Sequence, residues 1–132
     1  MSEHLGLYRC ETCGNLVQVL ISGEGELVCC GHPMSLLQPH KNDDSANEKH
    51  VPVFLEIPET GENKIQVGSI PHPMIESHYI QFIEAISKDN KYICIKFLEP
   101  EDEPIKNLRC SREINRAIEY CNIHGLWEGY KN

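Results

Sequence analysis

The sequence predicts a mainly β protein, in which a small cysteine-rich domain is followed by a β-sandwich. Three observations support this prediction. Residues 1–37 contain four cysteines and short alternating apolar stretches, residues 38–48 are polar and without periodicity, and residues 49–132 contain several short apolar runs separated by turn signals. We therefore expect a first domain at 1–37, a linker at 38–48 and a second domain at 49–132.

The first domain is expected to contain two short strands. The run "LVQVLI" at residues 16–21 predicts one strand, "GEGE" predicts a turn, and "LVCC" at residues 27–30 predicts a second strand. A unit of this length has too small a hydrophobic core to fold alone, and a bound structural metal ion would supply the missing stability.

The second domain contains three clear strand patterns. "VPVFLEI" at residues 51–57 includes Pro52, which favours an edge strand or a strand start. "NKIQVGS" at residues 63–69 alternates in the manner of a half-buried strand. "KYICIKFL" at residues 91–98 places Ile93, Ile95 and Phe97 on one face, and the intervening Cys94 is expected in the core.

Two further segments have spacing that also fits an amphipathic helix. For "HYIQFIEAIS" at residues 78–87, the β-branched and aromatic content favours a strand. For "REINRAIEYC" at residues 112–121, we predict a strand only near residues 119–121. Cys110, just before this segment, has no role that its surroundings indicate.

Composition restricts the class of protein. The chain has 132 residues and a formal net charge of −8. This charge argues against nucleic-acid binding, which needs clustered Lys and Arg. No apolar run approaches the ~20 residues of a membrane span, and the first residues show no signal-peptide pattern, so a cytoplasmic location is expected. Seven cysteines in such a chain indicate metal ligands or free thiols, and an odd number cannot all pair as disulfides.

The neighbouring cysteines of "GELVCCGHPM", Cys29 and Cys30, indicate a metal site. Successive side chains of a strand point to opposite faces, so neighbouring cysteines serve one site only where the backbone bends between them. Upstream, "YRCETCGNLV" provides a C-x2-C pair, Cys10 and Cys13, followed by Gly14. Four thiolates in a tetrahedron suit iron or zinc, and the ligand type does not separate the two metals.

The stretch "YRCETCGNLVQVLISGEGELVCCGHPM" closely resembles the desulforedoxin-type iron domain at the start of desulfoferrodoxins. The fragments "NEKHVP", "GSIPHPMIESHYI" and "EYCNIHGLWEG" resemble, in the same order, the superoxide reductase domain of that family. The resemblance covers nearly the whole chain. It implies an iron–tetrathiolate site at Cys10, Cys13, Cys29 and Cys30.

The same resemblance implies a second iron, bound in a plane by imidazole nitrogens and from below by an axial thiolate. The implied ligands are His50, His72, His78, His124 and the axial Cys121. The sixth position would be open in the ferrous state and covered by Glu48 in the ferric state, with Lys49 beside it. The resemblance also implies an immunoglobulin-like β-sandwich for the second domain, a homodimer and a rubredoxin-like electron donor.

This ligand set suits the reduction of superoxide to peroxide. Four neutral imidazoles and one thiolate leave a ferrous ion with a formal charge of about +1, which attracts an anion. The thiolate would push electron density toward the open position, as in haem–thiolate proteins. Because no segment of the chain has a positive net charge, attraction must be local, from the iron and Lys49.

Three other functions fit the same residues. The chain could be an electron-transfer protein with two metal centres, which would normally have closed coordination. It could be a zinc protein with one all-cysteine site and one mixed site, or a superoxide dismutase, which must also oxidise superoxide. Outside the ligand sets, Trp127 is expected to pack near the second site, over a ligand imidazole, and His4, His32 and His40 are expected at the surface.

Overall fold

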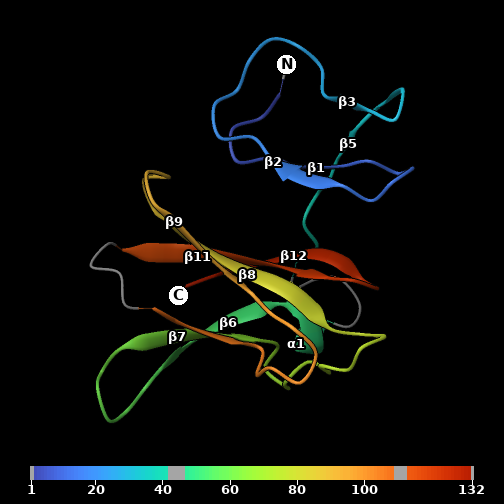
Figure 1. Ribbon diagram of the computed structural model, residues 1–132. Helices are drawn as coiled ribbons and strands as arrows, with labels where there is room; N and C mark the ends of the chain where they lie inside the picture. The colour runs from blue at the N-terminus through green and yellow to red at the C-terminus, as the bar shows by residue number, and fades with distance from the viewer. Residues whose placement is uncertain (1, 42–46, 109–112, 132) are drawn as a thin grey trace. The chain divides into compact units, whose positions relative to one another are not determined.

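The computed structural model describes residues 2–41, 47–108 and 113–131, and of residues 47 and 48 it describes the backbone only (Figure 1). The chain forms two compact units, Met1–Gln38 and Pro39–Asn132. Cys110 lies outside the described residues. In the part of the chain that is described, no helix is long and apolar enough to cross a membrane.

The first unit consists of short strands around few buried side chains. A three-stranded antiparallel sheet has the order β2-β1-β5, and β3 pairs with β4 in a two-stranded hairpin. The predicted strand at 16–21 is shorter than expected, and the predicted strand at 27–30 is β3. The strands are β1 Leu7–Arg9, β2 Leu16–Gln18, β3 Val28–Cys29, β4 His32–Pro33 and β5 Ser35–Leu36. The buried apolar side chains of this unit are Leu7, Tyr8, Cys10 and Val19, which is a small core.

The second unit begins its first sheet at a proline. β6 Pro52–Glu56 starts at Pro52 and is the edge strand of a sheet with the order β10-β7-β6. Its neighbours are β7 Asn63–Val67 and β10 Ile105–Leu108. The position of Pro52, at the start of an edge strand, fits a residue that has no backbone N–H to donate. Ile65 and Val67 of β7 are fully buried, as their alternation predicts.

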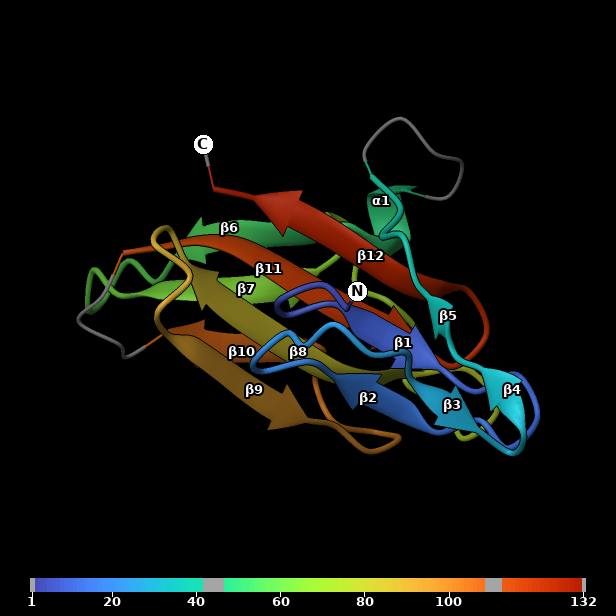
Figure 2. The ribbon, with the colours of Figure 1, turned by 90° about the horizontal axis from the view of Figure 1, so that it is seen from above.

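The second sheet is antiparallel, with the order β12-β11-β8-β9. Figure 2 shows its long strands side by side. They are β8 Ile80–Ser87, β9 Ile93–Phe97, β11 Ile114–Cys121 and β12 Gly125–Tyr130. The only helical element described is a single turn before β6, α1 Asn47–His50.

The two sheets of this unit form two layers with the hydrophobic core between them (Figure 1). The inward-facing residues include Val67 from one sheet and Ile83, Ala117 and Cys121 from the other. The predicted mainly β fold, with a small metal-binding unit and a β-sandwich of the immunoglobulin-like type, is therefore confirmed. Cys121 belongs to both the core and, as shown below, a metal site.

Two strand predictions need correction. β11 spans eight residues and is not limited to 119–121. It lies between β8 and β12 with both of its faces largely buried, so it reads as a nearly continuous apolar run. β9 is an edge strand whose five residues are all exposed, and Phe97 is 72% exposed. Cys94 is therefore exposed, which contradicts the expected core position.

Candidate metal centres

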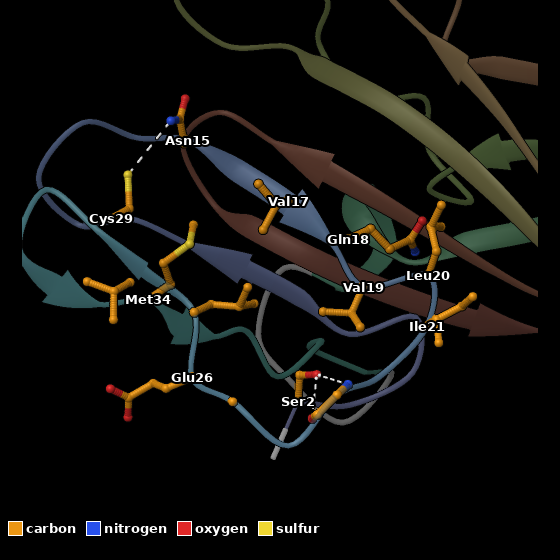
Figure 3. Close-up of a pocket in the computed structure, with 14 residues that line it drawn as sticks. Ser2, Asn15, Val17, Gln18, Val19, Leu20, Ile21, Glu26, Cys29 and Met34 are labelled. Carbon is orange, nitrogen blue, oxygen red and sulfur yellow. Dashed lines mark hydrogen bonds between the residues drawn. The ribbon is translucent and has the colours of Figure 1, made fainter.

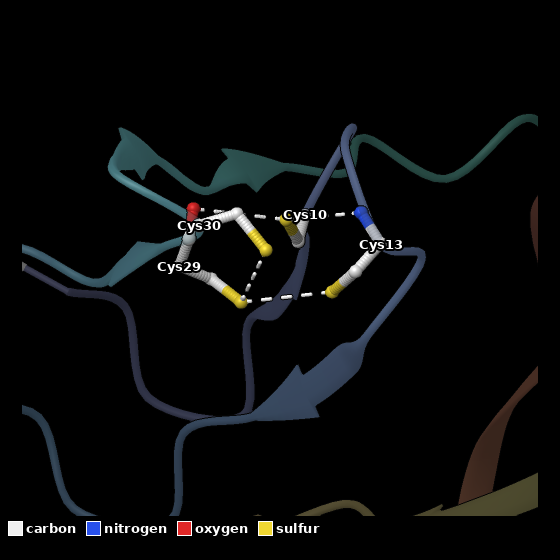
Figure 4. A group of neighbouring side chains, drawn as sticks. All are labelled: Cys10, Cys13, Cys29 and Cys30. Carbon is white, nitrogen blue, oxygen red and sulfur yellow. Dashed lines mark hydrogen bonds between the residues drawn. The ribbon is translucent and has the colours of Figure 1, made fainter.

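Four cysteines of the first unit converge on one point (Figure 4). Cys10 and Cys13 lie in the loop after β1, Cys29 ends β3, and Cys30 follows it. Their sulfur atoms all lie within 4.8 Å of one another. The six cysteines in the described residues, these four included, are free thiols.

The backbone bends between the neighbouring cysteines. Cys30 has a φ of +54°, in the left-handed region, and Gly31 follows with a φ of +78°. This conformation costs a non-glycine residue about 1–2 kcal/mol, but it turns the Cys29 and Cys30 side chains toward one site. On the other side, Gly14 has a φ of +83° and closes a tight turn with an N–H···O bond of 2.9 Å to the carbonyl of Cys10.

The sulfur spacing fits a tetrahedral metal ion. The Sγ atoms of Cys13 and Cys29 are 3.7 Å apart, and those of Cys29 and Cys30 are 4.0 Å apart. Metal–sulfur bonds of about 2.3 Å in a tetrahedron place sulfur atoms about 3.8 Å apart. The four thiols therefore form a cage of the right size, which we call centre I.

Cys10 and Cys30 of centre I have very different thiol pKa values. The backbone N–H of Cys13, 3.4 Å from the Cys10 sulfur, is the main cause that lowers the pKa of Cys10 to about 6. The neighbouring Cys13 thiol is the main cause that raises the pKa of Cys30 to about 12. Four adjacent thiols cannot all ionise without a cation between them, and a bound metal ion would deprotonate them together.

A surface groove of about 640 Å³ lies beside centre I (Figure 3). It is lined by residues of the first unit only, and Cys29 is one of them. Val17, Leu20 and Met34 contribute much of its apolar wall. One edge of centre I therefore borders an apolar surface.

A second cluster lies at one end of the sandwich. His50 ends α1, His72 and His78 lie in the connection from β7 to β8, and Cys121 ends β11. The donor atoms of these four residues all lie within 4.8 Å of one another. His124, in the β11–β12 turn, is exposed, but its ring lies beside two of these histidines.

The four imidazoles are arranged as a square. Successive ring centroids are 4.7 Å apart for His50 and His72, 4.6 Å for His72 and His78, 5.1 Å for His78 and His124, and 4.8 Å for His124 and His50. The diagonal from His50 to His78 is longer, at 6.3 Å. Such a square fits four equatorial ligands around one ion, and we call this cluster centre II.

The Nε2 atoms of His72 and His78 are placed where they could bind a metal ion. The Nδ1 of His72 lies 2.6 Å from the Pro73 carbonyl, which fixes Nδ1–H as donor and leaves Nε2 free. That Nε2 lies 3.1 Å from Nε2 of His50 and 3.6 Å from Sγ of Cys121. The Nε2 of His78 is buried without a hydrogen-bond partner. A buried orphaned nitrogen is costly, and a metal ion would satisfy it.

Burial favours the neutral form of His72 and His78, the form that binds metal. It lowers the pKa of His72 to about 4, and it also lowers the pKa of His78, with smaller effects from His124 and Lys49. Burial raises the pKa of Cys121, while the backbone N–H of His124, 3.4 Å from its sulfur, acts in the opposite direction. This N–H would donate to a bound thiolate and moderate its charge.

Lys49, next to His50, is exposed and close enough to affect the pKa of His78. The turn that contains Lys49 is held against Gly68, which has a φ of +83° and whose N–H donates to Val51 at 3.0 Å. A Cβ on Gly68 would lie 2.7 Å from the backbone carbonyl carbon of Lys49. Glu48 lies in the same helical turn, and its side chain is outside what the structure describes.

Two residues beside the candidate ligands of centre II are Trp127, which the sequence predicted near the site, and Asn122, which it did not. Trp127 stacks on His50 at 4.9 Å with an interplanar angle of 20°, as expected. Asn122 was not foreseen. Its Oδ1 accepts from the N–H of Tyr79 at 2.9 Å, and its Nδ2 donates to Ser77 at 3.1 Å, which ties the β11–β12 turn to the loop of His78. Its place between two ligand candidates was the only signal.

The fold and the two clusters define a class: a β protein with one all-sulfur metal centre and one histidine–cysteine metal centre. Comparison with known proteins agrees. The family model for desulfoferrodoxin matches residues 42–130, and the model for the desulfoferrodoxin N-terminal domain matches residues 2–37. This chain belongs to the desulfoferrodoxin family.

Its relatives match over nearly their whole length. A desulfoferrodoxin of Syntrophotalea carbinolica is 48% identical over 128 residues, 96% of this chain and 97% of that protein. A desulfoferrodoxin homolog of Archaeoglobus fulgidus is 45% identical over 130 residues, 97% of this chain and 98% of that protein. The crystal structure of the superoxide reductase from Treponema pallidum aligns with a TM-score of 0.68 and 27% identity, over 94% of this chain and 97% of that one.

The family and the two clusters together establish the cofactors. The protein uses two mononuclear non-haem iron ions per chain. One has a tetrathiolate environment, which centre I fits. The other has four imidazoles and one thiolate, which centre II fits.

Proposed function

We propose that this chain is a superoxide reductase, which reduces superoxide by one electron to hydrogen peroxide at centre II. The observation that carries this proposal is the square of four imidazoles with the buried thiol of Cys121 beside it. The structural similarity to the superoxide reductase from Treponema pallidum supports the same function. Removal of superoxide without production of dioxygen suits an anaerobe or a microaerophile.

The ligand assignment follows the two clusters. We assign the iron of centre I to Cys10, Cys13, Cys29 and Cys30, and that of centre II to His50, His72, His78, His124 and Cys121. His124 is included because its ring completes the square, although its exposed position sets it apart from the other three histidines. Iron bound there in the ferrous state supplies the electron for superoxide.

Residues around centre II have separate tasks in this reaction. The reaction consumes one superoxide, one electron and two protons for each hydrogen peroxide. The Lys49 ammonium draws the anion toward the site and orders a water that donates a proton. Cys121, buried at the end of a core strand, would bind the iron as a thiolate and supply negative charge beside the imidazoles. Glu48, from the same turn as Lys49, closes the site once the product has left.

The partners and boundaries are part of the same proposal. An external donor returns the electron, and a small rubredoxin-like protein is the donor we propose. A homodimer would cover apolar surface that the small first unit exposes, such as Leu20 and Ile21. The free thiols fit a reducing cytoplasm. We retain 1–37, 38–48 and 49–132 as the domains and linker.

Metal analysis combined with a visible spectrum tests the assignment. We expect two irons per chain, a tetrathiolate spectrum from centre I and, after oxidation, an additional thiolate-to-iron band from centre II. A colourless protein with two zinc ions that gains neither band after reconstitution with iron would contradict the proposal. Iron at centre I alone would leave only an electron-transfer function.

A further inference from the structure

The residues that lead into the second unit form a short strap along β12. The N–H of His40 donates to the carbonyl of Leu126 at 2.9 Å, and the N–H of Glu128 donates to the carbonyl of His40 at 3.0 Å. These two bonds form a parallel bridge between His40 and Trp127. Residues 39–41, which we call the strap, are thus fixed to the strand that carries Trp127.

An ion pair also joins Lys41 of the strap to Glu128 of β12. The ammonium of Lys41 lies 3.5 Å from a carboxylate oxygen of Glu128, and Arg116 lies 3.8 Å from the other oxygen. Glu128 is buried, at 6% exposure. Arg116 belongs to β11 and stays beside Glu128 whether or not the strap is in place, so only the exposed Lys41 ties the strap to this carboxylate.

The strap touches centre II through a column of three rings. The ring of exposed His40 lies 4.7 Å from that of Trp127, tilted by 40°, and Trp127 stacks on His50 at 4.9 Å. The indole Nε1–H also donates to the carbonyl of His124 at 3.1 Å. One indole therefore contacts two candidate ligands, and the ring of His40 contacts the indole.

We propose that His40 and the strap are a built part of centre II, in which His40 is a positioning residue that holds Trp127 against His50 and His124. The inference rests on the ligand assignment made above. Groups that orient metal ligands affect metal affinity by about 10- to 100-fold when they are removed. The connecting segment would then set how tightly centre II holds its iron.

The test is a chelator challenge of the intact two-iron protein, without superoxide. Loss of iron from centre II is followed by its thiolate-to-iron band and by emission from Trp127, which is the only tryptophan of the chain and should brighten when iron leaves. The variants are His40→Ala, which removes the ring, and His40→Phe, which retains one. His4→Ala, at an exposed histidine of the first unit, is the matched control.

We expect His40→Ala to release the iron of centre II about tenfold faster, with the bands of centre I unchanged. His40→Phe should restore most of the retention, and His4→Ala should behave as the parent. Equal release from His40→Ala and the parent, or a His40→Phe variant no better than His40→Ala, would overturn the proposal. Failure of the superoxide reaction would leave this result unaffected.

A second variant covers the case in which His40→Ala does not fold. Trp127→Phe retains a ring over His50 but lacks the N–H that donates to the carbonyl of His124. The proposal requires faster iron loss from this variant as well, followed by the thiolate-to-iron band. Iron retention equal to that of the parent would show that the indole does not position His124.

Discussion

The nitrogen atoms of His72 and His78 support the proposal that these histidines bind metal. His72 has one nitrogen committed to the Pro73 carbonyl, and His78 has a buried nitrogen with no partner. A histidine that served packing alone would satisfy both nitrogens or leave one in water. Their neutral state, which burial enforces, is also the state that binds iron.

Replacement of Lys49 tests local attraction of superoxide. We expect Lys49→Ala to slow capture of superoxide by roughly tenfold, the lower end of what focused charge supplies, and to weaken its salt dependence. Lys49→Arg should retain most of the rate because it keeps the charge. The measurement is the bimolecular rate by pulse radiolysis at several ionic strengths.

The control for this experiment is Lys131→Ala, which removes the same charge from another exposed position. If the two alanine variants slowed capture equally, the effect of Lys49 would be one of net charge and not of position. An unchanged rate in Lys49→Ala would remove the steering role altogether.

Glu119 gives a prediction on pH dependence. It is fully buried two residues before Cys121, both of its carboxyl oxygens lack a hydrogen-bond partner, and burial raises its pKa well above the ordinary 4.5. The folded protein therefore holds this carboxyl protonated over a pH range in which the unfolded chain releases the proton. Stability from this group is complete below pH 4.5 and is lost as pH rises toward the folded pKa.

The isosteric variant Glu119→Gln removes this titration. Between pH 4 and pH 7 the parent should therefore lose free energy of unfolding that the Glu119→Gln variant does not lose. Urea denaturation at both pH values measures the difference. Parallel pH profiles for the two proteins would mean that Glu119 is ionised in the fold.

Among the elements, the end of β7 and the helical turn α1 depend on each other through Gly68. Gly68→Ala places a methyl group against the backbone of both Ile70 and Lys49 and also strains a φ of +83°. The strain alone costs about 1–2 kcal/mol, and the collision should add to it and displace His50. We expect a lower free energy of unfolding and partial loss of iron from centre II.

Gly61→Ala is the matched control for Gly68→Ala. Gly61 has a φ of +73°, but a Cβ there would meet no atom within 4 Å. This variant should show the backbone strain without any loss of iron. Equal losses of stability and iron in the two variants would show that contact with Lys49 does not position centre II.

The strands show where sequence patterns succeed and fail. Alternation located β7 because one of its faces packs on the core, and Pro52 marked both the start and the edge of β6. Alternation misjudged Cys94, because an edge strand can alternate without a buried face. It also underestimated the length of β11. Both faces of this strand are largely buried, so apolar and polar residues do not alternate along it.

Centre II shows the same limits. The motifs pointed to the histidines and to Cys121, because each of these residues lies in a short, recognisable stretch of sequence. The roles of Asn122 and His40 depend on contacts between segments distant in sequence, with Ser77 and Tyr79 in one case and with Trp127 in the other. No spacing rule in the sequence encodes those contacts.

Considered as a whole, the chain separates its two metal centres into its two units. Cys13→Ser should therefore abolish the tetrathiolate spectrum and reduce iron from two ions to one, while the thiolate-to-iron band of centre II remains. Cys94→Ser, at an exposed cysteine of β9 outside both centres, should retain both irons. Metal analysis and visible spectra of the two variants give the answer.

Loss of both bands in Cys13→Ser would contradict this separation and show that centre II needs an intact centre I. Retention of the tetrathiolate band would show that Cys13 is not a ligand. Either result would revise the ligand assignment of the first unit.

The net charge of −8 makes the chain as a whole unattractive to an anionic substrate. At physiological ionic strength, however, interactions between exposed charges are screened beyond about 8 Å. We therefore expect distant acids to affect substrate capture less than Lys49 and the iron do. We propose that substrate attraction arises in the surroundings of centre II.

The most direct test is the reaction of the fully reduced protein with a known amount of superoxide, with dioxygen and peroxide measured together. We expect each centre II to be oxidised once, one hydrogen peroxide to form for each superoxide consumed, and no dioxygen to be produced. Production of dioxygen in step with peroxide would identify a dismutase. Absence of any oxidation of centre II would leave the chain as an electron-transfer protein.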